Sequence, residues 1–277
     1  MAPTPEHRIA ILGAGVMGET LLAALLRDGW QRSQLTICER RADRLDELTE
    51  VYRVSATSSA VEAVADATVV AVVVKPADAV AVLAEVAPHL RPGTLVVSLA
   101  AGVGTARYEA AIAEAGGPSE LPVIRVMPNT PAVIGAGVAA VSKGSHATDD
   151  HLNQVAALLS GMGEVVTVDE KDQDAVTALS GSGPAYVFAF IDAMIEGGVM
   201  MGLTREVATT LAVQTVLGSA TLARDTGDHP VLLRERVTSP GGTTAAGLHV
   251  LDARAMRAAV AEAMVAARDR SRELSGD

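Results

Sequence analysis

A short segment late in the chain combines hydroxyl side chains, a proline and two adjacent glycines. Pro240 ends a preceding helix, and Gly241 and Gly242 let the backbone approach a ligand without intervening side chains. Thr243 or Thr244 is expected to cap the helix that follows. Free N–H groups at the positive end of such a helix can bind a small anion such as a carboxylate, and the hydroxyls can donate to its neighbouring groups. A helix cap alone is the simpler interpretation for an isolated Gly-Gly-Thr.

A second pattern with chemical meaning opens the chain. The apolar stretch Arg8–Leu12 is followed by G-x-G-x-x-G and by an amphipathic helix over Glu19–Asp28, which is the context that the dinucleotide fingerprint requires. The first glycine makes a tight turn, the second lets the pyrophosphate approach, and the third packs the helix against the strand. We therefore expect the phosphates of a dinucleotide at this helix N-terminus. The six residues concerned are Gly13, Ala14, Gly15, Val16, Met17 and Gly18.

Bulk composition favours a cytoplasmic enzyme. The chain has 277 residues, enough for one large or two ordinary domains. Hydrophobic residues make up 49%, but the longest apolar run, Ala67–Val74, is too short to cross a membrane. The first seven residues show no signal-peptide core. The net charge of −11 argues against nucleic acid or an anionic membrane as a partner.

Cysteine and histidine usage points away from disulfides and metal ions. The single cysteine, Cys38, excludes an internal disulfide and is expected to fill the second strand. The six histidines are scattered, with no cysteine or carboxylate grouping at ligand spacing. We therefore predict no metal site.

The first 168 residues alternate between short apolar runs and helical patterns. Strands are predicted at 8–12, 35–39, 53–55, 68–74, 94–98, 123–127, 138–142 and 165–168. Helices are predicted at 19–28, 42–50, 59–65, 77–87, 104–115 and 148–159. Near-continuous Val/Ile/Leu strands between helices are typical of a parallel sheet covered on both faces. We expect a Rossmann-type α/β domain over residues 1–168, with a mostly parallel doubly wound sheet.

From residue 169 onward the strand signals stop. Helices are predicted at 172–179, 185–201, 205–224, 231–237, 244–251 and 253–274. Their apolar residues occupy more than one face, which an isolated surface helix does not need. We expect residues 169–277 to form an all-α domain that binds substrate and buries a subunit interface. The segment 180–184 is expected to break and kink a helix rather than to do chemistry.

Five motifs together resemble one enzyme family. Residues 13–18, 74–76, 125–131, 179–186 and 239–244 occur in the order and spacing of pyrroline-5-carboxylate reductases, across essentially the whole chain. This resemblance implies the last step of proline biosynthesis, in which a nicotinamide cofactor reduces the cyclic imine 1-pyrroline-5-carboxylate to L-proline. It also implies a small-molecule substrate and a homodimer interlocked through the helical domain, with assembly of five dimers into a decamer in some members.

The same resemblance assigns roles around the imine. It implies that Gly242, Thr243 and Thr244, with Gly241 in the same turn, hold the substrate carboxylate, and that the Thr244 hydroxyl contacts the ring nitrogen. An imine nitrogen is largely protonated near neutral pH, so no strong side-chain acid is required, and the protein supplies position and polarity.

Two further residues belong to the expected substrate site. Asn129 lies between two prolines in a rigid turn that follows a strand. Glu170 lies at the hinge between the two expected domains and matches a family position near the bound ligands. An ordinary interdomain salt bridge remains the alternative interpretation for Glu170.

Two strand ends are expected to line the nicotinamide, because ligands of such sheets bind at the carboxyl ends of the strands. The first is Val74, Lys75 and Pro76, and the second is Leu99, Ala100 and Ala101. Lys75 can equally be a solvated charge at a strand end.

The sequence gives contradictory indications about whether the cofactor carries a 2′-phosphate. Glu39 ends the second strand 21 residues after Gly18, where an acid binds the ribose 2′-hydroxyl of NAD. Arg40 and Arg41 follow directly and can hold the 2′-phosphate of NADP. Many family members have a neutral residue in place of Glu39. The glutamate can also point to solvent or orient an arginine. We expect NADPH as the cofactor, with NADH as the alternative.

Other enzyme classes fit the residues less well. A β-hydroxyacid dehydrogenase uses a lysine in its helical domain, but the lysines here are Lys75, Lys143 and Lys171. A short-chain dehydrogenase needs Tyr-x-x-x-Lys, and none of the three tyrosines is followed by lysine at that spacing. A reductase of another cyclic imine and a non-catalytic dinucleotide sensor remain as alternatives.

Overall fold

The computed structural model describes residues 7–275, in two compact units. The first unit runs to Ser182 and includes the chain from Ala267 onward, and the second is Gly183–Ala266. The segment Met1–Glu6, for which the sequence predicts no signal peptide, lies outside the described residues.

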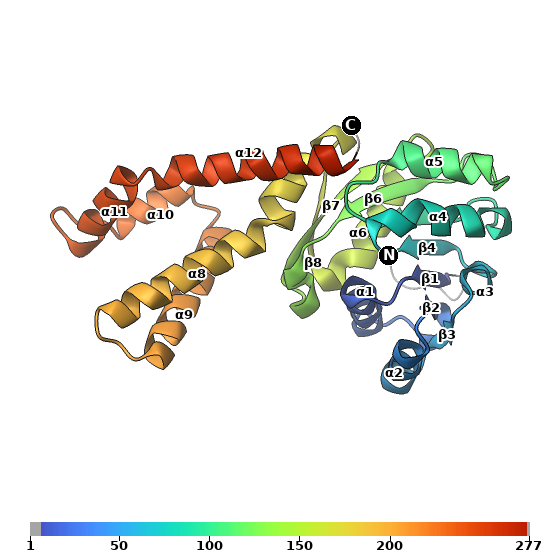
Figure 1. The fold of residues 1–277 in the computed structure, drawn as a ribbon, viewed down its shortest axis with the longest axis horizontal. Coiled ribbons are helices and arrows are strands. Elements are labelled where there is room, and N and C mark those ends of the chain that lie inside the picture. Colours follow the sequence, from blue (N-terminus) through green and yellow to red (C-terminus); the bar gives the residue numbers. More distant parts are fainter. Residues whose placement is uncertain (1–6, 276–277) are drawn as a thin grey trace. The chain divides into compact units, whose positions relative to one another are not determined.

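The first unit is built on one eight-stranded sheet (Figure 1). Its strand order is β3-β2-β1-β4-β5-β6-β7-β8, and every described pair is parallel except β6 with β7. This confirms the predicted α/β Rossmann-type sheet. The strands are β1 Ile9–Leu12, β2 Leu35–Cys38, β3 Ser55–Thr57, β4 Val69–Val72, β5 Leu95–Ser98, β6 Val123–Met127, β7 Gly137–Lys143 and β8 Gly163–Thr167.

Helices connect these strands. The α-helices are α1 Val16–Arg27, α2 Ala42–Tyr52, α3 Ala60–Val64, α4 Pro76–Val86, α5 Thr105–Glu114, α6 Asp149–Leu159 and α7 Gln173–Val176. Short 3-10 turns are η1 Arg32–Gln34, η2 Ala87–His89, η3 Thr130–Ile134, η4 Ser160–Met162 and η5 Glu170–Asp172. A π-helical turn, η6 Thr177–Gly181, leads out of the unit.

The sheet carries a hydrophobic core on each face. Ile9 and Ile11 of β1 point to one face, in a buried cluster with residues of α1, α2 and α6. Ala10 and Leu12 point to the other face, in a cluster with residues of α3, α4 and α5. Because successive side chains of a strand alternate between faces, a sheet buried on both sides needs continuous apolar strands, and the sequence supplies them.

At two places the structure can be compared with the sequence prediction in detail; it differs at the first and agrees at the second. The third strand begins at Ser55 rather than at 53, because Arg53 adopts a left-handed conformation (φ 54°) and caps the C-terminus of α2. The segment 180–184 does interrupt a helix: the π-turn ends at Gly181, and α8 begins at Gly183.

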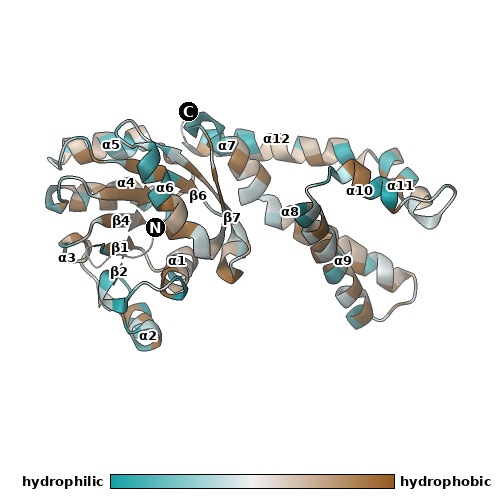
Figure 2. Cartoon of the chain, turned by 180° about the vertical axis from the view of Figure 1, so that it is seen from behind, coloured by the Kyte–Doolittle hydropathy of each residue, from teal (hydrophilic) through white to brown (hydrophobic). Residues whose placement is uncertain are grey.

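The second unit is entirely helical. It contains α8 Gly183–Met200, α9 Arg205–Thr226, α10 Pro230–Arg236 and α11 Thr243–Ala253, together with the first part of α12 Met256–Ser275. Large apolar side chains are exposed in this single chain, including Phe188 at 63% and Leu217 at 57%. Hydrophobic colour extends along α8 and α9 in Figure 2. Soluble chains rarely leave so much apolar surface uncovered, so these helices have the composition of an interface.

One helical stretch has the length and composition of a membrane span. Apart from the bend at Ser182, residues 170–200 are helical. The most apolar window of this stretch has a mean hydropathy of 1.3, and only 6% of it is buried. The run-length argument from the sequence did not detect it, because small polar residues interrupt the apolar ones. An apolar helix that packs against a second subunit has the same features.

The thiol of Cys38 should be inert in the folded protein. Its side chain is buried in β2, and burial together with the nearby carboxylates of Glu39 and Glu85 raises its pKa from 9.0 to about 11. Since the thiolate is the reactive form, we expect no labelling by an alkylating reagent at pH 8 and complete labelling in denaturant. Because the pKa is raised, any stability that it contributes is present below pH 9 and lost as the pH rises toward 11. Rapid labelling of the folded protein would contradict this expectation.

Candidate functional site

The β1–α1 turn is shaped by its glycines. Gly13 has φ of +106°, and a Cβ there would lie 2.8 Å from the carbonyl oxygen of Val73. A Cβ on Gly18 would overlap the carbonyl oxygen of Gly13, so only glycine permits this helix-to-turn approach. Gly15 has no atom near its Cβ position. The turn is therefore closed at its first and third glycines and open at its second, as a bound pyrophosphate requires.

The N-terminus of α1 is free to bind an anion. Its N-cap, Gly15, has no side chain to accept a hydrogen bond from the first helical N–H groups. Val16, the first helical residue, is 69% exposed. The N–H groups of Val16 and Met17 have no acceptor within the helix, and they lie at the positive end of a helix of 12 residues.

Glu39 faces this turn rather than solvent. Its carboxylate accepts hydrogen bonds from the backbone N–H of Ala14 at 3.3 Å and from that of Arg41 at 3.1 Å. The Arg41 guanidinium lies 3.6 Å away, and the Glu39 side chain is only 15% exposed. The structure thus shows an acid that faces the glycine turn and pairs with Arg41, instead of one that points to solvent. Contact with a ribose stays a prediction. Arg40 pairs instead with Asp78, at 3.8 Å on the surface.

Arg44 is a residue of this site that sequence reasoning did not identify. Its Nε donates to the carbonyl oxygen of Ala14 at 3.2 Å, and its guanidinium pairs with Glu19 of α1 and with Glu47. Burial would raise the pKa of Glu19, but hydrogen bonds from Tyr52 and Arg44 outweigh it and hold the pKa below its usual value. Glu39 and Arg44 therefore hold the backbone N–H and the carbonyl oxygen of Ala14, respectively. A signal was present, since Arg44 lies in the first turn of the helix that directly follows Arg40 and Arg41.

The two predicted nicotinamide-side segments lie at neighbouring strand ends. Backbone hydrogen bonds from Val73 to Leu12 (2.8 Å) and from Leu99 to Val72 (2.9 Å) continue the sheet past β4 and β5. Lys75 is the exposed N-cap of α4, with Pro76 at the first helical position. Leu99 and Ala100 are buried, whereas Ala101 is half-buried. Both segments therefore emerge at the same edge of the sheet as the glycine turn.

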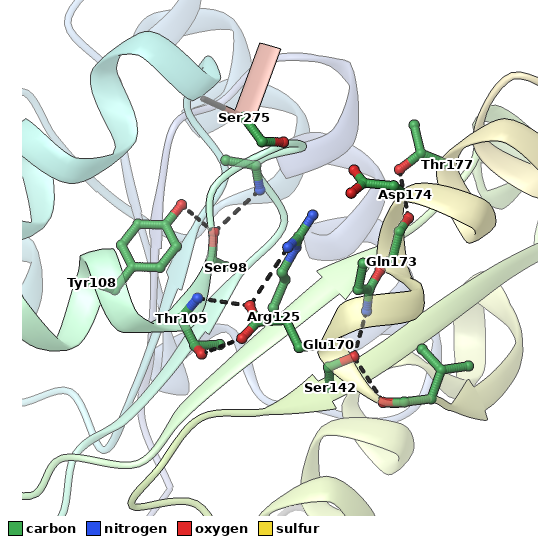
Figure 3. A network of polar contacts seen from close by, with 12 residues as sticks. Ser98, Thr105, Tyr108, Arg125, Ser142, Glu170, Gln173, Asp174, Thr177 and Ser275 are labelled. Carbon is green, nitrogen blue, oxygen red and sulfur yellow. Dashed lines mark hydrogen bonds and ion pairs between the residues drawn. The ribbon is translucent and has the colours of Figure 1, made fainter. Parts of the chain in front are cut away.

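Asn129 and Glu170 are engaged with the scaffold of the first unit. The Asn129 amide donates to the carbonyl oxygen of Ser180 at 3.2 Å and accepts from the backbone N–H of Val138 at 2.9 Å. Both Glu170 carboxylate oxygens accept hydrogen bonds from Thr105, and the carboxylate also pairs with a guanidinium of the same unit (Figure 3). A substrate contact by either residue stays a prediction, and their observed role is to join elements of the sheet domain.

The turn before α11 has a well-defined geometry. The Gly242 N–H donates to the Ser239 carbonyl oxygen at 3.0 Å, which closes a four-residue turn with Pro240 second and Gly241 third. Gly241 has φ of +70°, and proline followed by a positive-φ glycine is the residue pattern of a type II turn. The helix begins at Thr243 with Gly242 as N-cap and without a side-chain cap.

The prediction that Thr243 or Thr244 caps α11 is wrong. Gly242 already has the extended conformation of a cap (φ −80°, ψ 173°), so both threonines are the first helical residues. The consequence for binding is favourable: the first N–H groups of α11 lack both an intrahelical acceptor and a side-chain cap. A carboxylate is one ligand that could satisfy them.

Thr244 is half-buried, and its hydroxyl makes no hydrogen bond to any described residue. Helical threonines elsewhere behave differently: Thr20 and Thr49 donate to the carbonyl oxygen four residues earlier at 2.7 Å. Pro240 occupies that earlier position for Thr244 and lies in the turn rather than in a helix. The hydroxyl therefore keeps its donor and acceptor capacity for a ligand.

The structure divides the predicted site residues between its two units. The fingerprint, residues 39–41, 74–76 and 99–101, Asn129 and Glu170 belong to the first unit, whereas residues 241–244 belong to the second. Within residues 7–275, no group of three or more His, Cys, Asp or Glu side chains could hold a metal ion.

Comparison with known proteins identifies relatives of the whole chain. Residues 170–274 match the model described as pyrroline-5-carboxylate reductase dimerisation, and residues 8–102 match the model described as NADP oxidoreductase coenzyme F420-dependent. A pyrroline-5-carboxylate reductase of Mycobacterium tuberculosis is 43% identical, with 96% of each chain covered.

Two solved structures resemble the chain in three dimensions. A pyrroline-5-carboxylate reductase from Coxiella burnetii has a TM-score of 0.91 and 34% identity, covering 97% of this chain and 98% of that one. A pyrroline carboxylate reductase from Plasmodium falciparum, crystallised with NADP bound, has a TM-score of 0.85 and 28% identity, covering 99% of this chain and 100% of that one. With fold, motifs and full-length identity in agreement, the chain belongs to the pyrroline-5-carboxylate reductase family.

Proposed function

We propose that this protein reduces 1-pyrroline-5-carboxylate to L-proline in the cytoplasm, with NADPH as cofactor and NADH as the alternative. Residues 1–168 serve as the dinucleotide-binding domain, and residues 169–277 bind substrate and form a homodimer, with assembly of five dimers into a decamer as a further expectation. The observation that carries this proposal is the uncapped N-terminus of α11 with the unpaired Thr244 hydroxyl, in a chain that matches the family over its full length.

The first unit fits a nicotinamide dinucleotide. The open position at Gly15 and the uncapped α1 N-terminus suit a pyrophosphate, while Glu39 and Arg41 lie where the adenosine ribose is expected. Residues 74–76 and 99–101 lie at the strand ends on the other side of β1, where the nicotinamide is expected. When bound, the reduced nicotinamide supplies the hydride.

The α11 N-terminus fits the imine substrate. Its backbone N–H groups can donate hydrogen bonds to a carboxylate, and the helix dipole favours the negative charge. The adjacent Thr244 hydroxyl can hydrogen-bond the ring nitrogen and orient the reacting carbon. Because that nitrogen carries its own proton near neutral pH, the protein contributes position and polarity rather than an acid.

A second copy of the chain is the partner that the helical unit implies. Exposed apolar side chains lie along α8 and α9, among them Phe188, Leu211 at 54% exposure and Leu217. The matched dimerisation model covers the whole unit, which accounts for this surface and for the apolar run at 170–200 without a membrane.

The proposed reaction should be directly measurable. With racemic 1-pyrroline-5-carboxylate and NADPH or NADH, we expect loss of reduced-nicotinamide absorbance and accumulation of L-proline. The imine with one more ring carbon serves as the comparison substrate and should turn over more slowly. Oxidation of neither cofactor would overturn the proposal and favour a dinucleotide sensor, and a preference for the larger ring would assign the protein to another imine.

Replacement of Thr244 tests the substrate site. We expect Thr244→Ala to lower turnover about 10–100-fold with little change in cofactor affinity, because one hydrogen bond at the reacting nitrogen contributes roughly 1.4–2.7 kcal/mol. Thr244→Ser keeps the hydroxyl and should retain most of the activity. Steady-state kinetics at saturating cofactor make the comparison, and wild-type turnover by a folded Thr244→Ala protein would remove the proposed contact.

The residues after β2 should control discrimination at the cofactor's 2′ position. Joint replacement of Arg40 and Arg41 by alanine should raise the KM for NADPH at least about tenfold and leave that for NADH nearly unchanged, since the 2′-phosphate loses charged partners. Glu39→Ala should weaken NADH and spare or improve NADPH, because a carboxylate repels that phosphate.

Arg91→Ala provides the control for the arginine variants. Arg91 pairs with Asp66 before β5, at the opposite edge of the sheet, so neither KM should change. Equal effects of the double arginine change on both cofactors would show that Arg40 and Arg41 do not recognise the phosphate, and NADH would then be assigned.

A further inference from the structure

The amino terminus of α5 lacks a cap from its own sequence neighbourhood. The N-cap residue is Gly104, which has no side chain, and the first helical residue is the buried Thr105. A helix start that is buried without a partner for its N–H groups is costly. The partner comes instead from Glu170, which lies 65 residues later in the chain.

Glu170 binds Thr105 through both carboxylate oxygens. One oxygen accepts the Thr105 backbone N–H at 2.7 Å, and the other accepts the Thr105 hydroxyl at 2.6 Å. The carboxylate therefore satisfies a first-turn N–H and places a negative charge at the positive end of α5. Arg125 of β6, whose side chain is 8% exposed, lies 3.5 Å from the same carboxylate and compensates its charge.

The segment that carries Glu170 is itself fixed. The side chain of Gln173 is fully buried, and its amide donates to the Ser142 hydroxyl of β7 at 2.7 Å. That hydroxyl donates in turn to the carbonyl oxygen of Val168, two residues before Glu170, at 2.9 Å. Figure 3 shows these contacts beside the hydrogen bonds of Glu170 with Thr105 and its ion pair with Arg125. Glu170 therefore extends from a segment that is fixed to β7, and it ties the start of α5 to that strand.

The segment 99–104 lies between β5 and α5, and side-chain hydrogen bonds hold both of its ends. At its start, the Ser98 hydroxyl accepts from the backbone N–H of Ala100 at 3.3 Å and donates to the buried Tyr108 hydroxyl at 2.7 Å. At its end, Glu170 holds Thr105. The segment emerges at the carboxyl end of β5, on the side of β1 opposite to β2 and Glu39. In a doubly wound sheet this is the half of the crevice available to the nicotinamide.

We propose that Glu170 is a positioning residue for the cofactor: acting as a remote N-cap of α5, it holds residues 99–104 in the conformation that receives the nicotinamide ring. This inference rests on the proposed function, in which residues 99–101 line that ring. It assigns Glu170 a role on the cofactor side that does not require contact with the substrate. The adenosine half of the cofactor, at the glycine turn and Glu39, does not depend on Glu170.

Two ligands distinguish a loss of nicotinamide positioning from general damage to the cofactor site. NADPH carries the nicotinamide, whereas 2′-phospho-ADP-ribose has the same adenosine half without it. By isothermal titration calorimetry on the full chain, Glu170→Ala should weaken NADPH about three- to tenfold, in line with the loss of a helix cap, and leave 2′-phospho-ADP-ribose within experimental error. Asp174→Asn is the matched control, because Asp174 lies one turn later and bonds Ser271 rather than α5; both affinities should stay unchanged.

Glu170→Gln keeps an acceptor for the Thr105 N–H but removes the charge that faces α5 and Arg125. It should show the same selective loss, smaller than that of alanine, and it decides the question if the alanine variant does not fold. Equal weakening of both ligands, or no weakening of either, would overturn the inference. Failure of the wild-type protein to bind NADPH would instead overturn the proposed function, so the two failures are distinguishable.

Discussion

Four backbone hydrogen bonds that continue past the ends of the strands hold the predicted cofactor site together. Gly13 donates to Cys38, Glu39 to Thr57, Val73 to Leu12 and Leu99 to Val72, at 2.8 to 3.2 Å. The strands β2, β1, β4 and β5 pair in parallel and in register, so their carboxyl ends lie at one edge of the sheet. One ladder of hydrogen bonds therefore positions the glycine turn, Glu39 and the two segments that are predicted to line the nicotinamide.

Around that edge, the protein fixes loops with charged side chains that reach in from distant segments. Arg44 and Glu39 hold the backbone of Ala14, and Glu170 holds the start of α5. Each contact joins an ionised group to a backbone dipole, and such hydrogen bonds are stronger than neutral ones. Partial burial protects them from the screening that makes surface ion pairs weak. Rigid loops of this kind favour a pre-organised cofactor site.

The groups of the helical unit that are predicted to bind substrate are, in contrast, left without partners in one chain. The turn before α11 is closed by its own hydrogen bond from Gly242 to Ser239, and it offers an uncapped helix end and one hydroxyl that bonds no described residue. Unsatisfied polar groups are costly when buried but useful where a ligand completes them. The exposed apolar faces of α8 and α9 are likewise incomplete in one chain, which a dimerising partner would resolve. The polar groups around the glycine turn thus have partners within one chain, whereas the helical unit has polar groups and apolar faces without partners in one chain.

The sequence by itself determined the features whose cause is local in the chain. Strand, glycine turn and helix are adjacent in the fingerprint, so steric demands at Gly13 and Gly18 appear directly as glycines. Apolar periodicity likewise predicted the sheet and its helices, whereas the boundary at Arg53 and the cap of α11 depended on individual backbone conformations. Only the tertiary structure decided which partners Asn129 and Glu170 would meet, 51 and 65 residues away. Pairings across such distances follow from strand order and register, and no local pattern in the sequence encodes them.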